Sequence, residues 1–137
     1  MTIAVERTRF SAVGSTPHVM ANPDEECSVI FATPSNAPRL WREYLDGARA
    51  AYRRYGCGAA LDISAVIDGR QTTFFAAVVD RDGKVVGGLR VQGPFLASGE
   101  SHALLEWAPG AGRETLRSVI DERIADGVIE VKTAWGD

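Results

Sequence analysis

The chain has 137 residues, of which 45% are hydrophobic, and its 15 Lys and Arg against 18 Asp and Glu give a net charge of −3. This length and apolar content predict a single domain, residues 1–137, with one core. The basic residues are scattered, which argues against a nucleic-acid or anionic-membrane partner. No apolar run approaches the roughly 20 residues that span a bilayer, and the N-terminus lacks the apolar core of a signal peptide. We therefore expect a cytoplasmic protein.

The two cysteines, Cys27 and Cys57, have no cysteine or histidine neighbour at the spacing of metal ligands. In a reducing compartment, isolated cysteines of this kind are usually packing residues. The sequence therefore predicts neither a metal site nor a catalytic thiol.

The first half of the chain predicts an arm, a strand and a long helix. Residues 1–26 alternate weakly and then become rich in glycine, proline and asparagine, which predicts a loose or swapped arm ahead of a mixed α/β core over 27–137. Residues 27–32 form a short apolar run typical of a buried strand. Turn residues at 33–36 then precede a helix whose apolar residues recur at three-to-four spacing until Gly56.

The second half changes to strand-like runs separated by turns. Residues 61–67 fit either a strand or a short helix, and 72–79 are rich in aromatic and β-branched residues. The sequence Asp-Arg-Asp-Gly at 80–83 is a strong hairpin signal before a strand over 84–91. Proline at 94 ends that strand because it cannot donate to the ladder.

The last third predicts a strand over 102–107, a helix over 113–126 and a final strand over 128–135. The helix would then connect two parallel strands. The expected fold is α+β, with a mixed, largely antiparallel sheet and two main helices.

A glycine-rich turn, Gly110-Ala111-Gly112-Arg113, opens the second of these helices. Free N–H groups at a helix start bind anions, and glycines let a phosphate approach them closely. The turn fits neither standard nucleotide motif: Arg113 and Glu114 replace the Lys and hydroxyl residue of the nucleoside-triphosphate loop, and the third glycine of the dinucleotide motif is missing. It is either a small anion site or an ordinary turn.

The order of elements, the stretch from Phe74 to Arg90 and the Gly110-Ala111-Gly112 turn resemble the GNAT superfamily of N-acetyltransferases. The likeness covers residues 27–137 and is greatest to the branch of acyl-amino-acid and acyl-homoserine-lactone synthases. It implies the N-terminal portion of that fold, without the helix and two strands that complete the acyl-binding cleft. Trp107 stands where the family has Arg or Gln.

The resemblance implies an acyl-CoA or acyl-carrier-protein cosubstrate, whose pyrophosphate would rest on Gly110, Ala111, Gly112 and Arg113. The acceptor would be a small amine or amino acid. Glu106 matches the carboxylate that deprotonates the amine through water in the family, and its apolar neighbours would raise its pKa toward working pH. The alternative is a solvated glutamate at a strand end.

Two further residues are candidates for the same site. His102 is a possible acid or base, although a single histidine without an orienting partner is more often a surface or packing residue. Arg90 would contact either a phosphate of the acyl donor or a carboxylate of the acceptor, unless it faces solvent as most strand arginines do.

A different class of function fits the same elements, namely a noncatalytic interaction or scaffolding domain. It would pair through an exposed sheet edge at residues 128–131, because an uncovered edge offers unpaired N–H and C=O groups. Both hypotheses predict a homo-oligomer or a partner chain. They differ at Glu106, which faces a cleft at Gly110 in the enzyme and lies in an ion pair or in water in the interaction domain.

Overall fold

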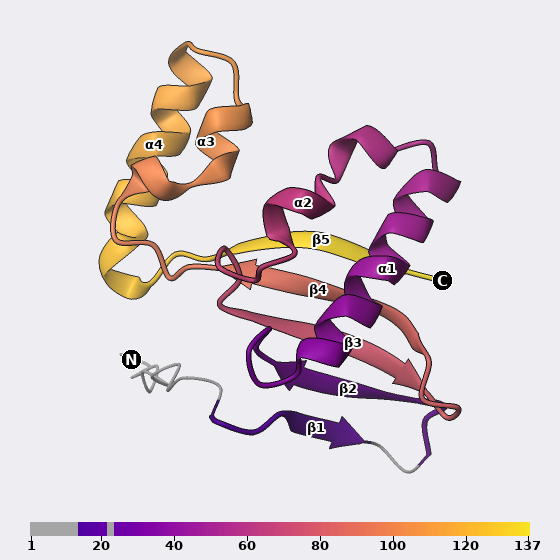
Figure 1. The fold of residues 1–137 in the computed structure, drawn as a ribbon. Helices are drawn as coiled ribbons and strands as arrows, with labels where there is room; N and C mark the ends of the chain where they lie inside the picture. Colours follow the sequence, from indigo (N-terminus) through magenta and orange to yellow (C-terminus); the bar gives the residue numbers. More distant parts are fainter. Residues whose placement is uncertain (1–13, 22–23) are drawn as a thin grey trace.

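A computed structural model describes residues 14–21 and 24–137 of the chain. It has the predicted α+β fold, with an antiparallel five-stranded sheet in the order β1-β2-β3-β4-β5 (Figure 1). The strands are β1 His18–Ala21, β2 Cys27–Ala32, β3 Phe74–Asp80, β4 Val85–Gln92 and β5 Glu130–Gly136. The helices are α1 Pro38–Arg54, α2 Ile63–Val66, α3 His102–Glu106 and α4 Ala111–Arg123.

Helix α1 packs across one face of the sheet and forms most of the core (Figure 1). Its apolar positions, spaced three and four apart, bury Trp41, Tyr44 and Leu45 on a single side. Trp41 and Tyr44 contact the ring of Phe75 on β3, at centroid distances of 5.1 and 5.6 Å. The polar atoms of both α1 aromatics are satisfied, because Trp41 Nε1 donates to the backbone oxygen of Ile67 at 3.0 Å and the Tyr44 hydroxyl to another backbone oxygen.

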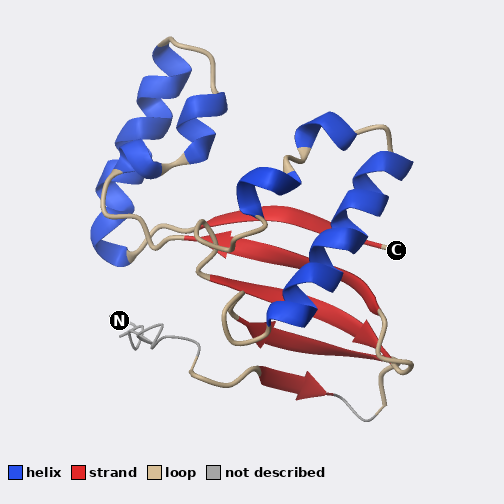
Figure 2. Cartoon of the chain, in the orientation of Figure 1, coloured by secondary structure: helices blue, strands red, loops and turns tan. Residues whose placement is uncertain are grey.

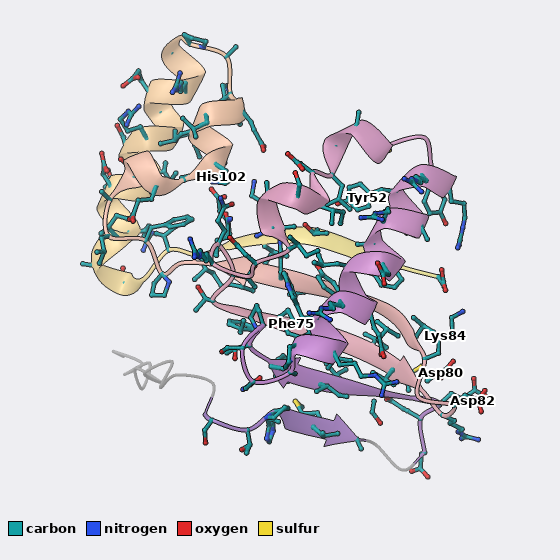
Figure 3. The ribbon with its side chains drawn as sticks, viewed as in Figure 1. Tyr52, Phe75, Asp80, Asp82, Lys84 and His102 are labelled. Atoms are coloured by element: carbon teal, nitrogen blue, oxygen red, sulfur yellow. The ribbon has the colours of Figure 1, made fainter. Side chains whose placement is uncertain are left out.

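Several predicted elements are confirmed. The strand over 27–32 and the long helix are present, and Pro38 occupies the first turn of α1, where a missing N–H costs nothing. The β3–β4 hairpin turns where predicted (Figure 3). There the Asp80 carboxylate accepts from the backbone N–H groups of Asp82 and Lys84, and Gly83 takes a positive φ of 82°.

The predicted strand over 102–107 is wrong, because His102–Glu106 is the short helix α3. Its sequence consists mainly of helix-forming residues, and the Glu130 carboxylate on β5 accepts from backbone N–H groups at its start. The prediction of two parallel strands joined by a helix is wrong for the same reason. Helix α4 is confirmed, but the strand after it, β5, pairs antiparallel with β4.

Two other expectations are refined. Residues 61–67 contain the short helix α2, the second of the two alternatives, and the side chain of Asp62 caps it by accepting from Ala65 N–H at 3.3 Å. The sequence predicts an N-terminal arm over residues 1–26. Residues 1–13 and 22–23 lie outside the described part, whereas His18–Ala21 form the edge strand β1, paired with β2.

Gly47, in the middle of α1, allows the indole of Trp135 from β5 to approach the helix. A Cβ at position 47 would lie 2.1 and 2.3 Å from two ring atoms of Trp135. Helix propensity alone favours Gly47→Ala by about 1 kcal/mol. Overpacking against a rigid ring costs about 1–3 kcal/mol, so we expect a net loss of stability.

Urea denaturation of Gly47→Ala measures this loss. Ala50→Gly is the matched control, since Ala50 is exposed on the same helix and reports propensity alone. If Gly47→Ala were more stable than the parent protein, the close packing of Trp135 on α1 would be wrong.

Candidate functional site

The residues that the sequence predicts for an acyl-transfer site lie on the hairpin formed by α3 and α4, beside the β4–β5 end of the sheet (Figure 1). Glu106 is the last residue of α3. Its side chain is 74% exposed and lies 3.4 Å from the Lys132 ammonium on β5. Together with Ala103, Trp107 and Ala108 it lines an open hollow on the hairpin surface. Glu106 therefore forms the exposed ion pair expected of the interaction domain, and the hollow beside it is lined by α3 residues, Trp107 and Ala108, not by Gly110.

The glycine turn joins two helices, because α3 rather than a strand precedes it. Gly110 caps α4 with a φ of 148°, and its carbonyl accepts from Glu114 N–H. A Cβ at Gly112 would lie 3.1 Å from Trp107 Nε1, so the indole packs over this glycine. The close approach of Trp107 gives Gly112 a packing role whether or not an anion binds.

His102 begins α3, one helical turn before Glu106 (Figure 3). Residues four apart lie on the same face of a helix, so α3 brings these two candidates together. The His102 backbone N–H is 3.3 Å from a carboxylate oxygen of Glu130. The half-buried position of His102 is thus fixed through its backbone.

Arg90 is the most unusual residue of the site, because its side chain is buried at 5% exposure. The Nε atom donates to Thr133 Oγ1 at 3.1 Å, and Nη1 is 3.4 Å from Gln71 O and 3.5 Å from Thr72 Oγ1. All three acceptors are neutral, and no carboxylate of the described residues forms an ion pair with this guanidinium. Burial lowers the pKa of Arg90. The alternative left open for Arg90, that it faces solvent as most strand arginines do, is wrong.

Two other polar atoms on β4 and β5 have no hydrogen-bond partner among the described residues. Gln92 Oε1 and Trp135 Nε1 are buried and form no hydrogen bond within the described part of the chain. Gln92 and Arg90 lie two residues apart on β4 and so share a face of the sheet. Most buried polar atoms in proteins are paired, and a buried charge without a counter-ion is costly. Gln92 Oε1 lies near Arg90 on the same face of β4, whereas Trp135 pairs with Gly88 four residues away along β4.

A distortion of β5 shapes this region. The pairing register of β4 with β5 shifts between Gly88 and Arg90, and Thr133 has a positive φ of 51°, which is rare for a β-branched residue. As a result the Thr133 carbonyl accepts from the Tyr44 hydroxyl at 2.6 Å, while its side chain accepts from Arg90. Strained residues of this kind are concentrated at functional sites.

Glu130 is a further carboxylate of this region, and no pattern in the sequence pointed to it. Its side chain is 13% exposed and accepts from Ser101 Oγ and, at 3.1 Å, from Ala103 N–H, and it lies 3.5 Å from Lys132 Nζ. Burial raises the pKa of this carboxyl, but the hydrogen bonds and the nearby ammonium outweigh that effect, so the net shift is downward. Glu130 holds the start of α3 against β5.

The described ranges, 14–21 and 24–137, also bear on metal sites and on membrane-spanning helices. They contain no group of three or more His, Cys, Asp or Glu that could hold a metal ion. None of their helices is both long and apolar enough to cross a membrane.

Comparison with known proteins identifies relatives without an assigned function. No family model and no solved structure matches the chain. The uncharacterized protein Rv1356c of Mycobacterium tuberculosis is 42% identical over 112 residues, which are 82% of this chain and 43% of the relative. The uncharacterized protein Mb1391c of Mycobacterium bovis matches equally. The chain thus spans less than half the length of these relatives.

Glu130 should make stability depend on pH. Its pKa is lower in the folded chain than in the unfolded one, so its contribution is complete above the unfolded value of about 4.3. The contribution is lost as the pH falls through the folded pKa. We expect Glu130→Gln to cost about 1–2 kcal/mol at neutral pH and the difference from the parent to shrink in acid.

Urea unfolding at neutral and acidic pH tests this expectation. Glu122→Gln, which changes an exposed carboxylate on α4, is the control and should have little effect at either pH. A difference between Glu130→Gln and the parent that stays constant with pH would contradict the assignment.

Proposed function

We propose that this chain is the acceptor-binding part of an N-acyltransferase-like protein, and that Arg90 binds the carboxylate of a small amino-acid acceptor. The observation that carries the proposal is the buried Arg90 guanidinium with neutral partners only. A carboxylate is the ligand that matches a planar guanidinium best, through two parallel hydrogen bonds. Binding would also supply the missing counter-charge.

The donors that remain on Arg90 fit this role. Its hydrogen bonds to the described residues use Nε and, at the long distances of 3.4 and 3.5 Å, Nη1. A carboxylate would bind through Nη2 and would take Nη1 from these long contacts to complete the two-point arrangement. The unpaired oxygen of Gln92 accepts hydrogen bonds, so it suits the ammonium or amide side of an amino acid. An amino acid carries both groups, whereas a simple amine carries only one.

The hairpin residues are connected to Arg90 through one lysine. Lys132 is the cross-strand partner of Arg90, and its ammonium lies 3.4 Å from Glu106. Cross-strand partners lie on the same face of a sheet, so Arg90, Lys132 and Glu106 form a continuous polar row. This row supports the proposed reaction, in which an amino acid held by its carboxylate at Arg90 would extend its amine along the row toward Glu106 as the base.

The proposed chemistry needs one proton transfer before acylation. An ammonium must lose a proton before its nitrogen attacks a thioester carbonyl, and Glu106 would accept that proton through water, with His102 as the other candidate on the same face of α3. The acyl donor is proposed to be acyl-CoA or acyl-carrier protein, with its pyrophosphate on Gly110, Ala111, Gly112 and Arg113. The proposal includes a cytoplasmic setting, where the free thiols of Cys27 and Cys57 stay reduced.

A second candidate is the noncatalytic interaction domain. It is favoured by the position of β5 at the sheet edge, where Val131 is 55% exposed and the neighbouring Ile129 is 41% exposed. In this case a strand of a partner would pair with β5. The two candidates are separated by whether the chain binds small molecules.

Calorimetric titration with the standard amino acids tests the role of Arg90. We expect at least one to bind, and Arg90→Gln to weaken its binding by at least about tenfold, because the charged contact is lost. Arg90→Lys should be intermediate, since an ammonium cannot form the two-point contact. Arg39→Gln is the control, as the side chain of Arg39 is 93% exposed on α1. If the matching decarboxylated amine bound equally well, Arg90 would not be a carboxylate site.

Titration with coenzyme A and acetyl-CoA tests the donor site. Gly112→Glu places an anion where the pyrophosphate should rest, so it should abolish saturable binding. Glu106→Gln should leave binding intact and reduce acyl transfer by about 10²-fold or more. A folded parent chain that binds neither coenzyme A nor an amino acid would favour the interaction domain.

A further inference from the structure

The central strands β2 and β3 are apolar on both faces. An antiparallel sheet with one wet face normally alternates apolar and polar residues, while near-continuous apolar runs mark strands that are covered on both sides. Strand β3 reads Phe-Phe-Ala-Ala-Val-Val-Asp, and Phe75 and Ala77 already belong to the core under α1. The residues between them must therefore point to the opposite face.

The pairing register shows which residues share that second face. Met20 pairs with Val29, which pairs with Val78, and Ala76 on the same side of β3 pairs with Leu89. Cross-strand partners point the same way. We call this surface the outer face, and every strand contributes to it, through Met20, Val29, Phe31, Val78, Leu89 and Val131.

Helices cover only the α1 side in the part of the chain that is described. Figure 2 draws α1 and α2 on the same side of the sheet, with the α3–α4 hairpin beyond one end. On the outer face Met20 is 57% and Val131 55% exposed, while Val29, Val78 and Leu89 between them are half-buried. A contiguous apolar surface of this kind marks an interaction site.

The outer face is large enough for a specific interface. With about 4.8 Å between strands and about 3.3 Å per residue, five strands of about six residues span roughly 24 by 20 Å, or about 480 Å². Two such faces bury about 960 Å², which is the size of a weak specific dimer and not of a tight one.

We propose that the outer face binds a second copy of this chain, so that two sheets stack face to face. In a two-fold interface each surface meets itself, so any charge on it would meet a like charge. The six residues named above are all uncharged and apolar, so the middle of the outer face carries no such charge. The register also places His18 and Asp80 on this face, at the ends of their strands, and the Asp80 carboxylate is held by the N–H groups of the β3–β4 turn. Stacked sheets lie about 10 Å apart, the thickness of a normal core.

This dimer is independent of the proposed function. Arg90 pairs with Phe75 and therefore lies on the α1 face, so stacking of the outer faces leaves its surroundings open. Loss of dimerisation without loss of ligand binding, or the reverse, would separate the two proposals.

Sedimentation equilibrium of the full chain tests the dimer. Val19 and Met20 are neighbours on β1 with similar exposure, 55% and 57%, but they point to opposite faces. We expect the parent chain to be a dimer, Met20→Lys and Val78→Lys to raise its dissociation constant by about tenfold or more, and the matched control Val19→Lys to change it by less than about twofold.

A parent chain that remains monomeric at about 100 µM, a concentration at which even weak specific dimers form, would overturn the proposal. So would a dimer equally sensitive to Val19→Lys, or one insensitive to Met20→Lys, which would indicate pairing through the β5 edge at the far side of the sheet. Thermal melting by circular dichroism reports whether each variant is folded. If Val78→Lys does not fold, the exposed Met20→Lys variant decides the question.

Discussion

Much of this structure depends on the packing of Tyr44 in the middle of α1. Its ring is fully buried and stacks on Phe75, and its hydroxyl reaches across the sheet to the carbonyl of Thr133. A Cβ at Gly88 would lie 3.0 Å from the Tyr44 ring, so the glycine allows α1 to lie this close to β4. Burial raises the pKa of Tyr44, which keeps the phenol protonated as a donor. One side chain therefore connects the helix with three neighbouring strands.

The same contact links the core to the candidate site. Thr133 accepts one hydrogen bond through its carbonyl and another, from Arg90, through its hydroxyl. A β-branched residue with positive φ costs about 1–3 kcal/mol, and the two hydrogen bonds offset that cost. The strain and the buried guanidinium are thus parts of one arrangement. A ligand that neutralised Arg90 would stabilise the bulge and, through it, the packing of α1.

The sequence was sufficient where structure is decided locally and insufficient where it is decided at long range. Helix α1 and the β3–β4 hairpin follow from apolar spacing and from turn residues such as Gly83, so both were predictable. Helix α3 was not, because a carboxylate more than twenty residues later, on Glu130, caps its start. The burial of Arg90 depends on the Thr133 bulge in the adjacent strand β5, which no local pattern in β4 encodes.

Each face of the sheet has groups that a binding partner could complement, and strand β4 contributes residues to both faces. Among residues 14–21 and 24–137, no carboxylate pairs with the guanidinium of Arg90 on the α1 face, and no helix covers the apolar side chains of the outer face. Arg90 and Leu89 are consecutive residues that point to opposite faces, so an anion and a second copy would each stabilise the same strand without competing for space. Anything that binds only the folded state raises its stability. Binding on either face would therefore make β4 harder to unfold. Because Tyr44 packs against β4, binding would also stabilise the core around Tyr44.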